Sequence, residues 1–274
     1  MIPTREMTNH VPVAASEIIE QVLEACETGI TMVHLHARDE LTGEPSCKAD
    51  AFASIIGGIR KYDQELVIVV TLSGRNVVEL EKRREPLSLT GEVKPDMGSL
   101  TLSSVNFNRQ TSVNHPDTIN ALAADMQRLG IMPELEAFDC GMINYAKYLW
   151  KKGVLSPPFY FNLIFGNIAC AQANLLHMGV ALADLPPDTL WSMGGIGDAQ
   201  LMVNAVAVAA GGGVRVGIED NIWYDSERTL LARNIDLVKR VHALADIHGR
   251  KVMLPSELRR LLHLAPGHGK YGRD

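Results

Sequence analysis

The sequence lacks the features that mark several classes of protein. Its four cysteines, at positions 26, 47, 140 and 170, are widely spaced and form no CxxC pair, which excludes a typical zinc finger or disulfide framework. There is no block of basic residues and the formal net charge is −6, which argues against nucleic acid as a partner. A reducing compartment, the cytoplasm, fits this cysteine usage best.

Long apolar runs are also missing. No run is long enough to span a membrane, and the N-terminus lacks the charged-then-apolar layout of a signal peptide. We therefore expect a soluble protein of the cytoplasm. Of the 274 residues, 46% are hydrophobic, which is enough to fill a complete core.

Apolar runs and helical patterns alternate along the chain. Seven buried strands are predicted, near residues 30, 66, 97, 131, 159, 189 and 213. Helices are predicted over residues 16–27, 52–62, 77–84, 116–129, 141–152, 169–178, 199–210, 226–248 and 256–263. Because the strands are continuous apolar runs, we expect them to be parallel and covered on both faces.

This alternation predicts an α/β fold, a (β/α)8 TIM barrel that lacks its first strand at the N-terminus. We expect one barrel domain over residues 1–274 with C-terminal helices, ending in a mobile tail from Pro266. Two explanations for the missing strand stay open. Either the true start lies upstream of Met1, or the seven strands or a partner chain close the gap, since an uncovered edge invites aggregation.

The first predicted strand carries two histidines, His34 and His36. Alternate residues of a strand share a face, so both imidazoles point the same way, with Leu35 turned to the other side. Such a pair at a strand end can bind a divalent metal. The alternative is chance spacing, with one histidine in the core and the other in solvent.

Glu219 is the best candidate for a third ligand, because it follows the last strand, which neighbours the first in a closed barrel. Two histidines and a glutamate with open positions form a catalytic zinc set. Arg215 and Asp220 bracket Glu219, and a buried arginine needs an anion such as Asp220 or a substrate carboxylate. Asp220 could take a proton beside a metal-bound carbonyl. A surface acid and a structural ion pair are the alternatives.

Weaker signals lie at other strand ends. Glu136 could bind substrate or orient another group, and a structural role is equally open. Thr71, Ser73 and Ser99 add hydroxyl groups. The glycines of 194–197 and 211–213 could admit a ligand close to the backbone or serve tight packing, and the first run matches neither GxGxxG nor the P-loop.

Taken together, these motifs resemble the β-keto acid cleavage enzymes over nearly the whole chain. The matching segments are His34-Leu35-His36-x-Arg38, Ser73-Gly74, Pro133-Glu134-x-Glu136, Gly195-Ile196-Gly197 and residues 214–221, with Asn114-His115-Pro116 and Pro3-Thr4-Arg5 also fitting. HxHxR by itself would be a weak signal. Combined with Gly217-x-Glu219-Asp220-Asn221 at this separation, it is specific.

The resemblance implies a zinc-dependent (β/α)8 enzyme, usually a homotetramer, that converts a β-keto acid and acetyl-CoA into acetoacetate and a new acyl-CoA. By position, the Zn²⁺ ligands are His34, His36 and Glu219. Asp220 corresponds to the base that forms the enolate, with Arg215 as its partner. The family's further active-site positions fall on Glu136, Ser99 and Thr71, where threonine replaces a serine.

The chain departs from the family in two ways. The family's first strand is absent, and the glutamate that recognises an amino group in the 3-keto-5-aminohexanoate cleavage enzyme falls on Ile2. A cationic substrate is therefore not expected. Two other functions remain open: a zinc hydrolase of the amidohydrolase type, which needs further metal ligands on later strands, and a non-catalytic relative.

Overall fold

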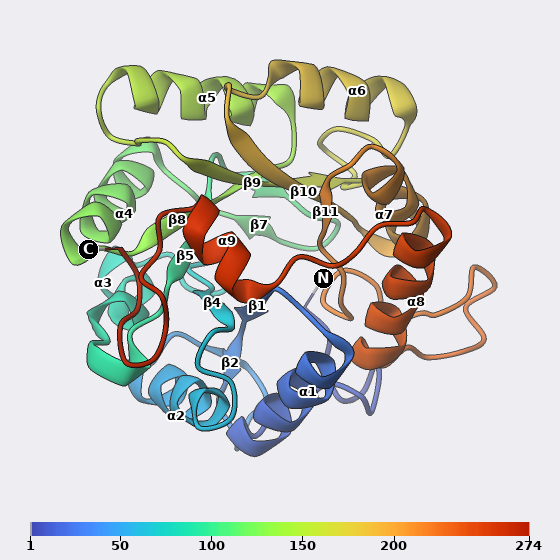
Figure 1. Ribbon diagram of the computed structural model, residues 1–274, viewed down its shortest axis with the longest axis horizontal. Coiled ribbons are helices and arrows are strands. Elements are labelled where there is room, and N and C mark those ends of the chain that lie inside the picture. The colour runs from blue at the N-terminus through green and yellow to red at the C-terminus, as the bar shows by residue number, and fades with distance from the viewer. Residues whose placement is uncertain (1, 274) are drawn as a thin grey trace. The chain divides into compact units, whose positions relative to one another are not determined.

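A computed structural model describes residues 2–273, and helices and strands alternate along it (Figure 1). Seven strands form one sheet, in chain order: β1 (Met32–Leu35), β4 (Val67–Val70), β5 (Met97–Thr101), β8 (Met132–Ala137), β9 (Phe159–Phe165), β10 (Thr189–Gly195) and β11 (Gly213–Val214). The pairs β1–β4, β4–β5, β9–β10 and β10–β11 are parallel. The seven predicted strands and the α/β class are confirmed.

The contacts divide the chain into two compact units, which are described separately. Unit 1 consists of Met1–Val11, Leu102–Thr111 and Leu135–Lys251, and unit 2 of Pro12–Thr101, Ser112–Glu134 and Val252–Asp274. The boundary runs through β8. The prediction of one domain over residues 1–274 remains a prediction, as does the barrel with a missing strand.

Unit 2 has an apolar core that follows the predicted patterns. All four residues of β4 are buried, as a strand covered on both faces requires. Helix α2 (Ala49–Arg60) buries the stripe Phe52, Ile55, Ile56 and Ile59 at helical spacing. Each such side chain contributes about 1.5–3 kcal/mol when it is buried fully. The other helices of this unit are α1 (Ala15–Thr28), α3 (Leu80–Arg83), α4 (Pro116–Leu129) and α9 (Pro255–Leu261).

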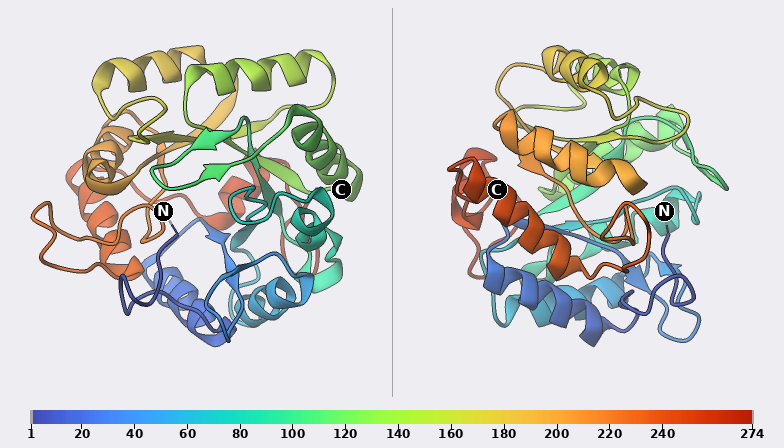
Figure 2. Two further views of the ribbon diagram at one scale, coloured as in Figure 1. Left: turned by 180° about the vertical axis from the view of Figure 1, so that it is seen from behind. Right: turned by 90° about the vertical axis from the view of Figure 1, so that its right-hand side faces the viewer.

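Unit 1 contains α5 (Cys140–Lys151), α6 (Leu175–Asp184), α7 (Gln200–Ala209) and α8 (Asn234–Ile247). Helices α5 and α6 run side by side, as both views in Figure 2 show. Strand β9 is buried along its whole length beside β10. Two short strand pairs were not predicted from the sequence. One is β2 (Ala37–Arg38) with β3 (Pro45–Ser46), which belongs to unit 2, and the other is β6 (Val105–Asn106) with β7 (Thr111–Ser112).

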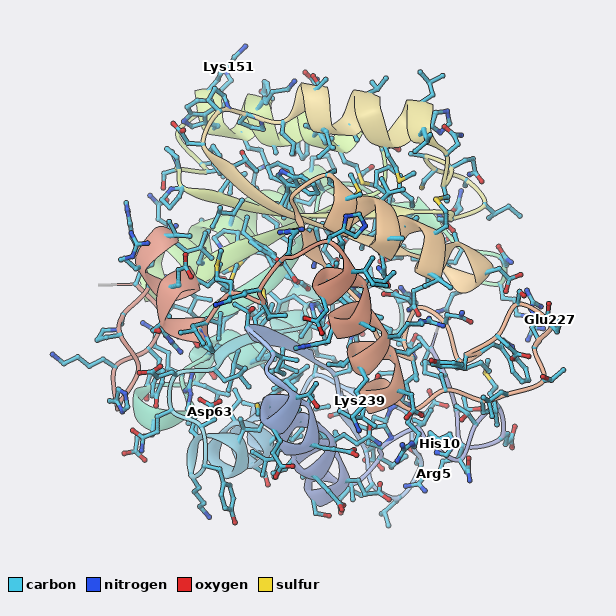
Figure 3. The ribbon with its side chains drawn as sticks, turned by 45° about the vertical axis from the view of Figure 1, so that its right-hand side comes forward. Arg5, His10, Asp63, Lys151, Glu227 and Lys239 are labelled. Carbon is cyan, nitrogen blue, oxygen red and sulfur yellow. The ribbon has the colours of Figure 1, made fainter. Side chains whose placement is uncertain are left out.

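Two predicted helices begin later than expected. The helix predicted over 169–178 starts at Leu175, because the Asn174 side chain caps it by accepting a hydrogen bond from the His177 amide. The helix predicted over 226–248 starts at Asn234. Before it, the Asp225 carboxylate binds the amides of Thr229 and Leu230 and folds a turn, which carries Glu227 outward (Figure 3).

The four cysteines are free thiols. Within the described residues, no helix combines the length and apolarity needed to cross a membrane. The predicted mobile tail is wrong. Tyr271 is only 6% exposed, and the Arg60 guanidinium lies 3.3 Å from the centre of its ring.

Asp96 binds the tail of unit 2 to its core. This carboxylate is fully buried and accepts hydrogen bonds from Arg259 at 2.9 Å, from Arg60 at 3.3 Å and from the amide of Gly272 at 3.0 Å. Burial lowers the pKa of Arg60 to about 10 even with Asp96 beside it. Two buried guanidinium groups thus depend on one carboxylate.

We expect Asp96→Asn to destabilise the protein by about 3–5 kcal/mol, because it leaves buried arginine charge uncompensated. Urea unfolding followed by circular dichroism measures the loss. The control is Glu81→Gln, which removes an exposed carboxylate from its ion pair with Arg84 and should change stability little. Equal losses of unfolding free energy in the two variants would mean that the buried cluster contributes no more to stability than a surface ion pair.

Candidate metal centre and active site

The two histidines lie at the end of β1, as the sequence predicted: His34 is in the strand and His36 directly follows it. Their ring centroids are 5.1 Å apart, with the planes tilted by 31°. Leu35 between them is buried in the core. The strand alternation therefore places both imidazoles on one face, and the alternative of one core and one solvated histidine is wrong.

Glu134 is a functional candidate that the sequence reasoning missed. Its Oε2 lies 2.7 Å from Nδ1 of His34, and the side chain is 1% exposed. The signal was present: Glu134 and Glu136 are alternate residues of β8, so their side chains share a face. The sequence does not show which of the two acids meets His34, because a contact between residues one hundred positions apart leaves no local pattern.

Arg215 gathers three carboxylates in unit 1. Its Nε donates to Asp220 at 3.1 Å, one terminal nitrogen donates to Glu219 at 2.9 Å, and the other donates to Glu136 at 3.3 Å. The predicted Arg215–Asp220 pair is confirmed. Glu136 and Glu219 are further partners of the same guanidinium. Three acids facing one arginine leave an excess of formal negative charge, which favours a cation nearby.

Helix α7 supports the segment that carries these acids. Asn204, which is buried, donates to the backbone carbonyl of Arg215 at 3.0 Å. Gln200, also buried, donates to the carbonyl of Gly217 at 2.9 Å. The amide of Gly197 binds the carbonyl of Asp220 at 2.8 Å. Two amide side chains on an otherwise apolar helix are the one feature of the sequence that hints at this role.

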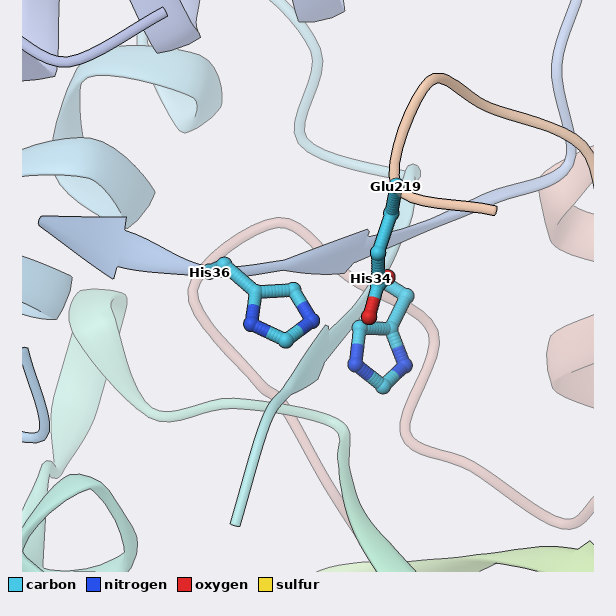
Figure 4. A group of neighbouring side chains, drawn as sticks. All are labelled: His34, His36 and Glu219. Atoms are coloured by element: carbon cyan, nitrogen blue, oxygen red, sulfur yellow. The ribbon is translucent and has the colours of Figure 1, made fainter. Parts of the chain in front are cut away.

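His34, His36 and Glu219 are a group of side chains that could hold a metal ion (Figure 4). Two imidazoles and a carboxylate are the donor set of catalytic zinc sites. A second such group contains His34, Glu134 and Glu136. The residues present thus fit a divalent metal.

The hydroxyl candidates bind the backbone just after β4. Ser99, which is buried, accepts a hydrogen bond from the amide of Leu72 at 2.9 Å. Thr71 accepts one from the amide of Ser73 at 3.3 Å. These contacts fix the end of the strand. A part in catalysis for either residue remains a prediction.

The glycine runs serve close packing. A Cβ on Gly195 would lie 2.7 Å from the backbone of Ala199 and Gln200, and a Cβ on Gly212 would lie 1.9 Å from the ring of Trp191. Neither position tolerates a side chain without movement of its neighbours. Of the two possibilities left open for these runs, packing is the one that these contacts support.

A family model described as "beta-keto acid cleavage enzyme" matches residues 1–264. The 3-oxoadipate:acetyl-CoA acetyltransferase of Cupriavidus necator is 36% identical over 266 residues, covering 96% of this chain and 91% of the relative. The 3-keto-5-aminohexanoate cleavage enzyme of Fusobacterium nucleatum is 32% identical over 265 residues, covering 95% of this chain and 93% of the relative.

Solved structures of ObcA share the fold. The apo structure superimposes with a TM-score of 0.76 at 19% identity, covering 92% of this chain and 65% of that one. The binary complex of ObcA with oxaloacetate gives a TM-score of 0.79 at 19% identity, with 92% and 67% covered. The chain thus spans about two thirds of ObcA, and at this identity the likeness concerns the fold alone.

Proposed function

The chain belongs to the β-keto acid cleavage enzyme family, and we propose that it uses zinc to convert a β-keto acid and acetyl-CoA into acetoacetate and a new acyl-CoA. Acetyl-CoA-dependent cleavage of β-keto acids is the activity of the family. The single observation that carries the zinc-dependent form is the His34, His36 and Glu219 group, with Asp220 next to Glu219 in the chain.

His34, His36 and Glu219 would hold the zinc ion. Glu219 has two carboxylate oxygens, so Oε2 can accept from Arg215 at 2.9 Å while the other oxygen serves as a ligand. Bound zinc would polarise the keto and carboxylate oxygens of the substrate and make the C2 proton more acidic. Arg215 keeps Glu219 in position for this role.

Asp220 is the proposed base. It is 5% exposed, and Arg215 orients its carboxylate through a hydrogen bond of 3.1 Å. Asp220 takes the C2 proton, and the resulting enolate forms a carbon–carbon bond with the thioester carbonyl of acetyl-CoA, releasing the CoA thiolate. The thiolate then attacks the original keto carbon. Cleavage of its bond to C2 gives the new acyl-CoA, and C2 regains a proton to yield acetoacetate.

The other predicted residues have supporting roles in this proposal. Glu136 completes the set of carboxylates around Arg215 and restrains the guanidinium. Ser99 and Thr71 shape the backbone after β4, where their hydroxyl groups bind amides. The proposal also includes the barrel with its first strand missing, one domain, a homotetramer, and a cytoplasmic location that suits four free cysteines.

The hydrolase alternative required further histidine ligands on later strands. Among the residues that the structure describes, the groups that could hold a metal contain no histidine besides His34 and His36. This composition supports the β-keto acid chemistry. A non-catalytic relative would bind zinc without turnover, which an assay of the parent protein with a β-keto acid and acetyl-CoA distinguishes.

The first prediction concerns the metal. His36→Ala should abolish bound zinc and activity while the protein stays folded, because a catalytic zinc ion does not hold the apolar core together. Zinc content by plasma emission spectrometry and circular dichroism check both points. His248→Ala, which removes an exposed histidine at the end of α8, should keep one zinc per chain. Undiminished zinc in His36→Ala would refute the ligand assignment.

The second prediction concerns the base. Asp220→Asn should retain zinc and lose roughly 10²–10⁴-fold in kcat, the usual contribution of a general base. Steady-state rates of acetoacetate formation measure the loss. Exchange of the C2 protons of the β-keto acid with deuterium, followed by NMR, isolates the proton-abstraction step. If the variant works within a few fold of the parent, another group is the base.

The third prediction concerns the substrate. By the resemblance, Ile2 takes the place of the glutamate with which the aminohexanoate enzyme recognises an amino group. A substrate ammonium group should therefore find no anion there, which should lower kcat/KM by about tenfold or more. Assays with acetyl-CoA should compare 3-keto-5-aminohexanoate with 3-oxohexanoate, which lacks only the amino group. The relative's name makes 3-oxoadipate a third test compound. A preference for the aminated compound would show that another acid, Glu136 first, has taken over recognition.

A further inference from the structure

The buried carboxylate of Glu134 has no part in the chemistry described so far. It lies on β8, and its Oε2 is 2.7 Å from Nδ1 of His34 on β1. Two strands, β4 and β5, separate β1 from β8 in the sheet order. In a flat sheet, strands three positions apart would be roughly 14 Å from each other. The sheet must curve within unit 2 to bring these two side chains into contact.

This contact sets the tautomer of the imidazole. A carboxylate can only accept a hydrogen bond, so at neutral pH the ring nitrogen that faces it carries the proton. Nδ1–H of His34 therefore donates to Glu134, and the lone pair of the ring lies on Nε2. Metal-binding histidines usually hold the ring in this way, with a carboxylate or carbonyl group behind it.

The burial of Glu134 makes a purely incidental contact costly. A carboxylate that is 1% exposed has lost most of its hydration, a penalty of several kcal/mol that its partners must offset. A protein that needed only to join β1 to β8 could use apolar side chains, since these replace buried ion pairs at no loss of stability. Glu136, on the same face of β8, binds Arg215.

We propose that Glu134 is a positioning residue for the metal: it fixes His34 as the Nδ1–H tautomer and leaves Nε2 free to bind the ion. The proposal rests on the zinc site proposed above. Glu134 acts through His34 and is not itself a ligand. The second such group, His34 with Glu134 and Glu136, gives the competing possibility that Glu134 binds the ion directly.

The test compares Glu134→Ala with the matched variant Glu136→Ala, which removes the neighbouring acid of the same strand face. Zinc affinity is measured by competition with a chromophoric chelator at constant pH. Glu134→Ala should weaken binding by roughly 10–100-fold, the usual effect of removing a carboxylate behind a metal-bound histidine. Glu136→Ala should change the affinity much less. Equal losses would mean that general negative charge is responsible, and would overturn the proposal.

Two spectroscopic measurements separate positioning from other roles. Long-range ¹H–¹⁵N NMR of the metal-free protein should show the Nδ1–H tautomer of His34 in the parent and a shift towards Nε2–H in Glu134→Ala. Absorption spectra of the cobalt-substituted protein should show the same coordination number in both. An unchanged tautomer, or a lost cobalt ligand in Glu134→Ala, would refute the positioning role.

The measurements distinguish a failure of this proposal from a failure of the proposed function. Failure of the parent protein to bind zinc would refute the zinc site itself. Tight zinc binding by the parent and an equal affinity in Glu134→Ala would refute only the role of Glu134. Glu134→Gln guards against misfolding of the alanine variant, because it keeps the side-chain volume. It also retains an oxygen that can accept from Nδ1–H, so a partial recovery of zinc affinity supports positioning, whereas a loss equal to that of Glu134→Ala contradicts it.

Discussion

The candidate active site depends on the ion pairs that the guanidinium of Arg215 forms. A largely buried arginine is stable only when anions surround it, and Arg215 meets this condition with Glu136, Glu219 and Asp220. The same contacts fix the direction of the two acids that follow β11. The ion pairs that neutralise Arg215 therefore also determine where Glu219, the candidate ligand, and Asp220, the candidate base, lie.

The backbone beneath these acids is held by neutral groups. Asn204 and Gln200 on α7 bind carbonyl groups of the segment after β11, and Gly197 binds the carbonyl of Asp220. These bonds satisfy buried backbone groups of a loop that leaves the sheet. The loop is consequently restrained in two ways: ion pairs hold its acidic side chains, and hydrogen bonds hold its backbone carbonyl groups. Its acids are therefore ordered before a substrate arrives.

The strands were predictable because their residues are mainly apolar, a pattern that depends on neighbouring residues only. The errors arose where polar side chains compete for the backbone. Asn174 starts α6 later than expected, and Asp225 folds a turn in place of helix. The tail was misjudged for another reason. Asp96 accepts a hydrogen bond from the amide of Gly272, which lies 176 positions away, and no local sequence pattern predicts this contact.

The sequence by itself determined the local part of the site. Strand alternation placed His34 and His36 on one face, and the motif around Glu219 and Asp220 indicated the family. Only the tertiary structure decided that Glu134 faces His34 and that Glu136 binds Arg215, because both contacts join residues far apart in the chain. Periodicity reports which face of a strand a side chain occupies. Which residue contacts that side chain depends on how the sheet curves, and only the tertiary structure defines this curvature.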